Sequence, residues 1–134
     1  MDNPRQYDSL GTMMLSHRRY NLGDANAGDD LPSKLRNEYN LPTLLAGIEK
    51  LGGVALTVYG YDHSIFRIST ESFIGRAHHA EWDSGILGVI YAMPQKIRKH
   101  YGVKRISKDL RRHVAAYLKI QVDSYDWYLN QEED

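Results

Sequence analysis

Residues 54–92 constrain the fold of this chain most strongly, because they hold its densest run of β-branched and aromatic side chains. Residues 54–59 alternate between apolar and less apolar side chains, which is the two-residue period of a strand with two unlike faces. Asp62-His63-Ser64 predicts a turn after this strand, since Asp and Ser side chains bond nearby backbone N–H groups. Residues 65–70 then predict a second strand, and the two strands form a β-hairpin.

A third strand is predicted over Gly85–Tyr91, where the sequence GILGVIY is almost continuously apolar. Continuous apolarity indicates burial on both faces, and therefore a central place in the sheet. Just before it, Asp83-Ser84-Gly85 predicts a tight turn that the Asp83 carboxylate organises, as Asp62 does in the first turn. We expect the Trp82 ring to be buried at this corner, between the central strand and the C-terminal helix.

Helical spacing dominates the C-terminal part of the chain. Ser107 caps the longest predicted helix, which runs to about Asn130 and carries one apolar stripe. The stripe consists of Leu110, Val114, Leu118, Val122, Tyr125 and Leu129. The tyrosines of this helix are assigned to the core or its edge: Tyr117, Tyr125 and Tyr128. Two shorter helices are predicted over residues 41–51 and 94–101, each followed by glycine.

These elements together predict an α+β fold, with a small, mostly antiparallel β-sheet, a long C-terminal helix packed on one face, and two short helices. At 134 residues the chain has the length of a single domain, 1–134, and can bury a core without disulfides. Residues 1–40 form a weakly patterned lead-in, in which residues 10–20 fit a strand and residues 21–30 a loop. The α+β core is therefore expected over residues 41–134.

The composition excludes several classes of site. The chain has no cysteine, which excludes disulfides, cysteine nucleophiles and cysteine-bound zinc, and which fits a reducing compartment. The first residues lack the apolar core of a signal peptide, and no apolar run has the length of a membrane span. We therefore expect a cytoplasmic protein with no membrane partner.

Charge is unevenly distributed along a chain whose 17 basic and 17 acidic residues cancel. Residues 96–112 carry a single acid, Asp109, among eight basic residues: Lys96, Arg98, Lys99, Lys104, Arg105, Lys108, Arg111 and Arg112. Such a cluster suits nucleic-acid phosphates, because neutralising each phosphate releases counterions. The alternative interpretation is a solvated helix face, since basic residues opposite an apolar stripe need no ligand.

The tyrosines supply a second candidate contact surface in a chain that contains ten of them. Tyr59 and Tyr61 share the strand face opposite Val54, Leu56 and Val58. Exposed tyrosines are common at interfaces, because they offer a large contact area with little rotamer entropy. We expect this tyrosine face to lie beside the basic segment and to bind a partner together with it.

Catalytic and metal-binding patterns are weak in this sequence. Histidines and carboxylates suited to a divalent metal gather in the predicted loops: Asp62, His63, His78, His79, Glu81 and Asp83. They lack the spacing of known metal motifs, so solvated loop residues explain them better. His63 lies between Asp62 and Ser64, but neighbours on a turn rarely reach the geometry of a catalytic triad. We assign no catalytic residue, metal ligand or cofactor, and a metal-dependent hydrolase stays a third hypothesis.

The motifs YDHS (61–64), WDSG (82–85) and GVIY (88–91), with IRKHYG, LRRHVAAYL and YDWYL further on, resemble a family of small proteins of phages, plasmids and other mobile elements. The resemblance covers roughly residues 50–130, and the family pattern is YDHSG followed by WDSGxxGxIY. This chain departs from it at Ile65, where the family has glycine, and in the longer, more basic loop GRAHHAE before Trp82. No enzymatic activity is assigned to the family, so no catalytic residue carries over from it.

The resemblance implies an accessory protein of a mobile element, and such proteins often inhibit host defence. We therefore expect a non-enzymatic inhibitor of the anti-CRISPR or anti-restriction type, which occludes a host defence protein or ribonucleoprotein complex in the host cytoplasm. The alternative hypothesis is a small nucleic-acid-binding protein that uses the basic residues of segment 96–112.

Overall fold

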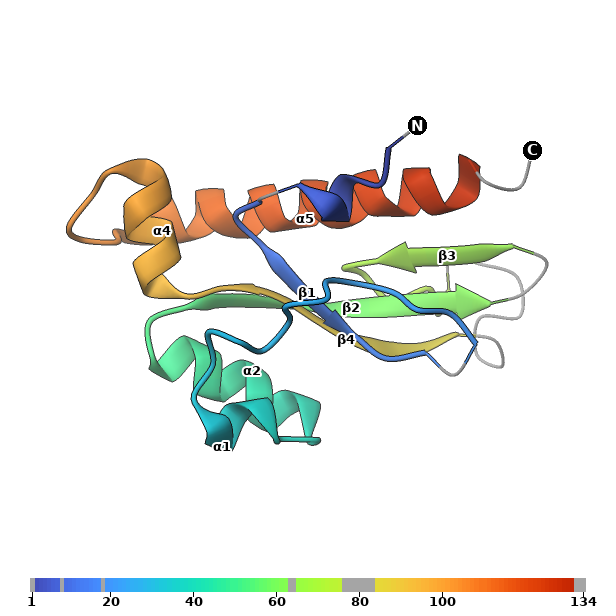
Figure 1. Cartoon of the computed structure of the whole chain (residues 1–134), viewed down its shortest axis with the longest axis horizontal. Coiled ribbons are helices and arrows are strands. Elements are labelled where there is room, and N and C mark those ends of the chain that lie inside the picture. Colours follow the sequence, from blue (N-terminus) through green and yellow to red (C-terminus); the bar gives the residue numbers. More distant parts are fainter. Residues whose placement is uncertain (1, 8, 18, 63–64, 76–83, 132–134) are drawn as a thin grey trace.

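The computed structural model of the chain describes residues 2–7, 9–17, 19–62, 65–75 and 84–131. Within them, four strands form one sheet in the order β1-β4-β2-β3, and each neighbouring pair is antiparallel. The strands are β1 Thr12–Leu15, β2 Val54–Asp62, β3 Phe66–Ser69 and β4 Ser84–Ala92. The predicted hairpin is confirmed as β2 and β3, and the predicted central strand is confirmed as β4, which lies between β1 and β2 (Figure 1).

Helices lie on both faces of this sheet (Figure 1). They are the 3-10 helix η1 Pro4–Gln6, α1 Ser33–Arg36, α2 Leu41–Lys50, α4 Pro94–Tyr101 and α5 Lys108–Gln131. Helix α5 runs along one face, and α1 and α2 lie against the other, which confirms the predicted α+β fold. Among the helices described here, none has the length and apolar character needed to cross a bilayer.

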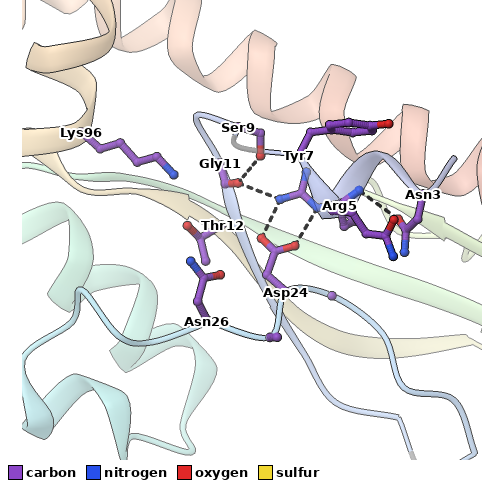
Figure 2. A pocket seen from close by; sticks show the side chains of 12 residues that line it. Asn3, Arg5, Tyr7, Ser9, Gly11, Thr12, Asp24, Asn26 and Lys96 are labelled. Atoms are coloured by element: carbon purple, nitrogen blue, oxygen red, sulfur yellow. Dashed lines mark hydrogen bonds and ion pairs between the residues drawn. The ribbon is translucent and has the colours of Figure 1, made fainter.

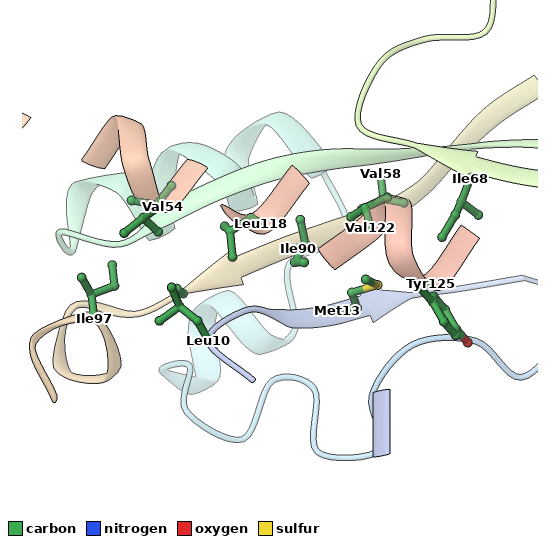
Figure 3. Packing of buried hydrophobic residues seen from close by; sticks show 12 residues of the cluster. Leu10, Met13, Val54, Val58, Ile68, Ile90, Ile97, Leu118, Val122 and Tyr125 are labelled. Carbon is green, nitrogen blue, oxygen red and sulfur yellow. The ribbon is translucent and has the colours of Figure 1, made fainter. Parts of the chain in front are cut away.

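The sheet face under α5 carries the larger core (Figure 3). Leu118 and Val122 of α5 are completely buried, in one cluster with Val58 of β2 and Ile90 of β4. Burying each large apolar side chain stabilises the fold by about 1.5–3 kcal/mol. The predicted apolar stripe of the long helix is thereby confirmed as one half of the core.

Helix α2 covers the opposite face, where Ile48 packs in one cluster with Val89 and Tyr91 of β4. Successive strand residues point to opposite faces, so Ile90, between these two, lies in the α5 core. The second half of β4 is therefore buried on both faces, as predicted. The first half differs, since Ile86 is 59% exposed.

Two local predictions are wrong. Ser84, predicted in the turn, belongs to β4 and pairs with Tyr61 of β2, so the strand begins inside the predicted turn, one residue before its predicted start at Gly85. Tyr117, predicted to be core or half-core, is 37% exposed on α5. Several residues of the predicted corners and loops lie outside the described residues, and their predictions stay predictions: His63, His78, His79, Glu81, Trp82 and Asp83.

Candidate binding surface

The exposed basic residues of segment 96–112 lie at one end of the molecule, where α4 meets α5 (Figure 1). We define the basic end by four exposed side chains: Lys99 on α4, Lys104 and Arg105 in the connection, and Lys108 at the start of α5. No described residue forms an ion pair with any of these four. Within the described part of the chain, the basic end is an uncompensated positive surface.

Local sequence determines how the basic end is built. Gly102 ends α4 in the left-handed conformation, with φ 66°, and the Val103 N–H donates to the Arg98 carbonyl at 3.1 Å. The Ser107 hydroxyl accepts a hydrogen bond from the Leu110 N–H at 3.1 Å, which caps the start of α5 as predicted. Two capped helix ends therefore carry the basic side chains.

Two further basic residues of the segment are already engaged within the protein. Arg111 is half-buried, and its Nη1 donates to the carbonyls of Gly52 at 3.1 Å and Gly53 at 3.3 Å. These bonds tie α5 to the turn between α2 and β2. Arg112 is exposed and forms an ion pair with Asp109, one helical turn earlier. Arg111 thus stabilises the fold, and Arg112 belongs to a solvated helix face.

The predicted contact residue Lys96 lines a polar cavity of about 540 Å³ between the N-terminal segment and α4 (Figure 2). Arg5, also in the lining, donates from Nε and Nη2 to the two carboxylate oxygens of Asp24, at 2.9 and 2.7 Å, and from Nη2 to the Gly11 carbonyl at 2.7 Å. The side chains of this ion pair are 3% and 9% exposed, so the pair holds the N-terminal segment against β1. Sequence reasoning missed it, because no pattern connects two polar residues so far apart.

The tyrosine face does not lie beside the basic end, so the predicted adjacency is wrong. Arg111 holds α5 to the start of β2, whereas Tyr59 and Tyr61 lie near the end of that strand. Seven residues separate Val54 from Tyr61, which is about 23 Å along a strand. Tyr61 is only 7% exposed, and its ring stacks on Phe73 with the centroids 5.4 Å apart. It belongs to a small core, while Tyr59 is half-buried beside it.

A histidine–aspartate pair, which sequence reasoning also missed, joins the end of β2 to the loop after β1. His17 Nδ1 accepts from the backbone N–H groups of Arg19 and Tyr20 at 3.0 and 3.2 Å, and Nε2 lies 3.6 Å from the Asp62 carboxylate. Asp62, predicted as a structural corner, also forms an ion pair with Arg19. Both ring nitrogens of His17 face protein groups, so the imidazole positions this loop and does not present a free base.

Aromatic rings join α4 to α5 beside the basic end. The Tyr101 ring packs edge-on against His100 and His113, with the centroids 4.7 and 5.7 Å apart. Burial raises the pKa of the Tyr101 hydroxyl, which has no hydrogen-bond partner among the described residues. The His100 ring also lies 6.2 Å from Tyr117. Packed helices therefore present the basic end.

A resident metal is the remaining possibility that the sequence raised. No group of three or more histidine or carboxylate side chains suited to a metal ion occurs within the described part of the chain. The candidate ligands His78 and His79 lie outside that part, so the metal hypothesis stays a prediction.

Comparison of the chain with protein-family models, with curated proteins and with solved structures finds no match.

Proposed function

We propose that the protein is a non-enzymatic binding protein of a mobile element, which inhibits host defence by occluding a nucleic-acid-containing host complex with its basic end. One observation carries this proposal: four exposed basic side chains meet where α4 and α5 join, and no described carboxylate neutralises them. Phosphate groups would neutralise these charges and release counterions. The resemblance to proteins of mobile elements supplies the context of host defence.

The way the charges are held supports binding to phosphates. They sit on or between two capped helices, and Arg111 anchors the second helix to the turn between α2 and β2. A surface held in place before binding loses little conformational entropy when its partner arrives. Arg105 can hydrogen-bond a phosphate through two N–H groups, whereas the three lysines act as point charges.

Among the described residues, His17 lies beside a carboxylate, and its contacts support the non-enzymatic part of the proposal. A general base needs a ring nitrogen that can reach a substrate proton. In His17, Nδ1 accepts from two backbone N–H groups and Nε2 faces Asp62, so the ring is used to hold a loop.

Direct binding of free nucleic acid is the second candidate function, and the same four charges favour it. The two candidates differ in whether the partner must be a complex. A protein that binds free RNA or DNA through the basic end will shift an oligonucleotide in a gel without any host protein. An inhibitor specific for a complex will bind that complex and leave free oligonucleotides unbound.

The test combines purified components with cells. Binding of the tagged protein is measured against single- and double-stranded RNA and DNA in 50 mM salt, and against a lysate of bacteria that carry CRISPR or restriction systems, with and without nuclease treatment. Protection of a phage is scored by plaque counts in the same bacteria. Arg105→Glu is the test variant, and Lys34→Glu, an exposed charge reversal on α1, is the matched control.

We expect Arg105→Glu to weaken binding roughly tenfold and to reduce protection, while Lys34→Glu leaves both unchanged. Recovery of a defence complex without binding of free oligonucleotides supports the first candidate. A shift of free oligonucleotides without phage protection supports the second. Absence of binding in every arm, or equal effects of the two variants, refutes a role for the basic end.

A further inference from the structure

Helix α5 carries a second apolar stripe on its outer side, in addition to the stripe that it buries in the core. We call the second set the outer stripe: Tyr117, Ile120, Ser124 and Trp127. Tyr117 is 37% exposed, Ile120 62% and Trp127 54%, and Ser124 between them is also exposed. At 100° per residue, Ile120 and Trp127 lie about 160° and 180° around the helix from the buried Leu118. These two side chains therefore point away from the core stripe.

An exposed isoleucine and an exposed tryptophan on one helix face are typical of an interaction surface. A helix at the surface of a globular protein ordinarily places polar residues on the face opposite its core. Aligned apolar side chains on that face are a feature by which an interaction surface is recognised. Trp and Tyr are also among the residues enriched at such interfaces.

The spacing of the outer stripe indicates that its partner is a helix. Positions 117, 120, 124 and 127 follow the alternation of three and four residues that defines the contact line of a two-stranded coiled coil. When two copies of this helix run antiparallel, Tyr117 of one lies level with Trp127 of the other. At the next level Ile120 meets Ser124, whose small side chain leaves room for it. The stripe is therefore complementary to itself.

Charge along α5 selects the antiparallel direction. The exposed charges of residues 108–119 are three basic residues and one acid, a net charge of +2: Lys108, Arg112, Lys119 and Asp109. In residues 120–131 the exposed charge is Asp123, because Asp126 is buried and paired with Arg67. The sequence then continues with Glu132, Glu133 and Asp134. A parallel pair would place like charges together, whereas an antiparallel pair places the basic half of each helix beside the acidic half of its partner.

We propose that the outer stripe of α5 is the interface of a symmetric homodimer in which the two α5 helices pack antiparallel. A twofold axis makes each contact occur twice, which is the symmetry that a self-complementary surface requires. The proposal does not depend on the basic end or on the identity of any host partner.

The first experiment measures mass in solution across a range of concentrations by light scattering or sedimentation. The chain has a mass of 15.4 kDa, so the dimer is expected at 30.8 kDa, which is twice that value. We expect Ile120→Glu to weaken association roughly 100-fold, because it places a carboxylate in the apolar contact. Tyr39→Glu is the matched control, since Tyr39 is a fully solvated aromatic residue, 98% exposed and away from α5.

The second experiment tests whether the two α5 helices run antiparallel. Because the chain has no cysteine, the introduced cysteines are the only ones that can form a disulfide. Ile120→Cys and Ser124→Cys are prepared separately, then mixed and oxidised. Antiparallel helices bring position 120 of one copy to position 124 of the other, so the mixture forms a cross-linked dimer more rapidly than either variant alone. Parallel helices would instead cross-link each variant with itself.

A mass of 30.8 kDa that Ile120→Glu lowers to 15.4 kDa, with preferential cross-linking of the mixture, supports the proposal. A monomer at all concentrations overturns it, as does a dimer that persists in Ile120→Glu. Cross-linking of each variant with itself also overturns it, because the helices would then be parallel. Circular dichroism confirms that Ile120→Glu is folded, and Trp127→Lys provides a second disruption of the same stripe.

Discussion

Tyr91 in β4 offers the sharpest test of how the α2 side of the sheet is held. Its ring is completely buried, and its hydroxyl donates to the Asp30 carboxylate at 2.7 Å and accepts from the Gly28 N–H at 3.0 Å. The loop before α1 is thereby fixed to the central strand. Tyr91→Phe removes the hydroxyl, leaves the buried Gly28 N–H without its acceptor, and should cost about 2–3 kcal/mol at pH 8.

The same contacts predict how this cost changes with pH. Burial, assisted by the hydrogen bond to Asp30, raises the pKa of Tyr91 far above the ordinary tyrosine value of 10.0. The folded protein therefore keeps this proton when the unfolded chain has lost it. The contribution of the Tyr91 hydroxyl to the free energy of unfolding is therefore complete below pH 10. It falls as the pH rises above 10 toward the pKa that Tyr91 has in the folded protein. The loss amounts to about 1.4 kcal/mol per pH unit.

Urea unfolding followed by circular dichroism at pH 8, 9, 10 and 11 measures both effects. The difference in unfolding free energy between the wild type and Tyr91→Phe should be constant up to pH 9 and should shrink between pH 10 and 11. Tyr39→Phe, at a position that is 98% exposed, is the control and should match the wild type throughout. A difference below about 0.5 kcal/mol at pH 8, or one that does not change between pH 9 and 11, would refute the reasoning.

Two further substitutions test the attachment of β3 and the end of α4. Asp126 accepts from the Ile68 N–H at 2.9 Å and from Arg67 at 2.8 Å. Asp126→Ala should therefore lower the free energy of unfolding in urea by about 2–3 kcal/mol. The control is Asp123→Ala, at an exposed position, which should change it by less than about 0.5 kcal/mol. Gly102→Ala should cost about 1–2 kcal/mol, because its Cβ meets no atom but the left-handed φ of 66° disfavours any side chain. Gly85→Ala, in extended strand and open space, is the control for thermal unfolding, and an equal loss there would contradict the conformational explanation.

Local periodicity explains which parts of the fold could be predicted from the sequence. Apolar residues three and four apart define the core stripe of α5, and alternation defines β2, because each pattern repeats within one element. The helix ends could be predicted equally well, because Ser107 and Gly102 act on backbone groups only a few residues away. Ser84 is predicted in a turn because the pattern Asp-Ser-Gly suits one, whereas cross-strand pairing with Tyr61 of β2 includes this position in β4.

Polar contacts between residues far apart in the chain leave no repeating pattern in the sequence, so they could not be predicted from it. Asp126 lies in a sequence region without any base, yet it pairs with Arg67, which is 59 residues away. Tyr91 and Asp30 are 61 residues apart, and their hydrogen bond depends on the packing of the α1–α2 segment against β4. The one local hint at Asp126 is a carboxylate directly beside the buried Tyr125, in a helix whose other buried positions are apolar. Such a residue needs a partner, but its identity follows only from the tertiary structure.

The candidate binding surface, too, could be predicted from the sequence only in part. Sequence located the run of basic residues, because charge density is a local property, but it could not separate the exposed side chains from the engaged ones. Arg111 and Arg112 are adjacent, yet one bonds the carbonyls of Gly52 and Gly53 while the other faces solvent beside Asp109. The tyrosine face was misplaced for a related reason, since strand alternation gives the side of the sheet and not the distance to a helix that follows later in the chain.

An antiparallel α5 pair would also change what the basic end can bind. Helix α5 contains 24 residues and is therefore about 36 Å long, so the dimer would carry its two basic ends at opposite ends of an elongated body. One basic end alone offers four exposed charges, which neutralise few phosphates. A nucleic acid long enough to reach both ends would be held at two places, and the second contact would form at the high effective concentration set by the first. Dimerisation would thus let a chain with no net charge bind a long polyanion well and a short one weakly.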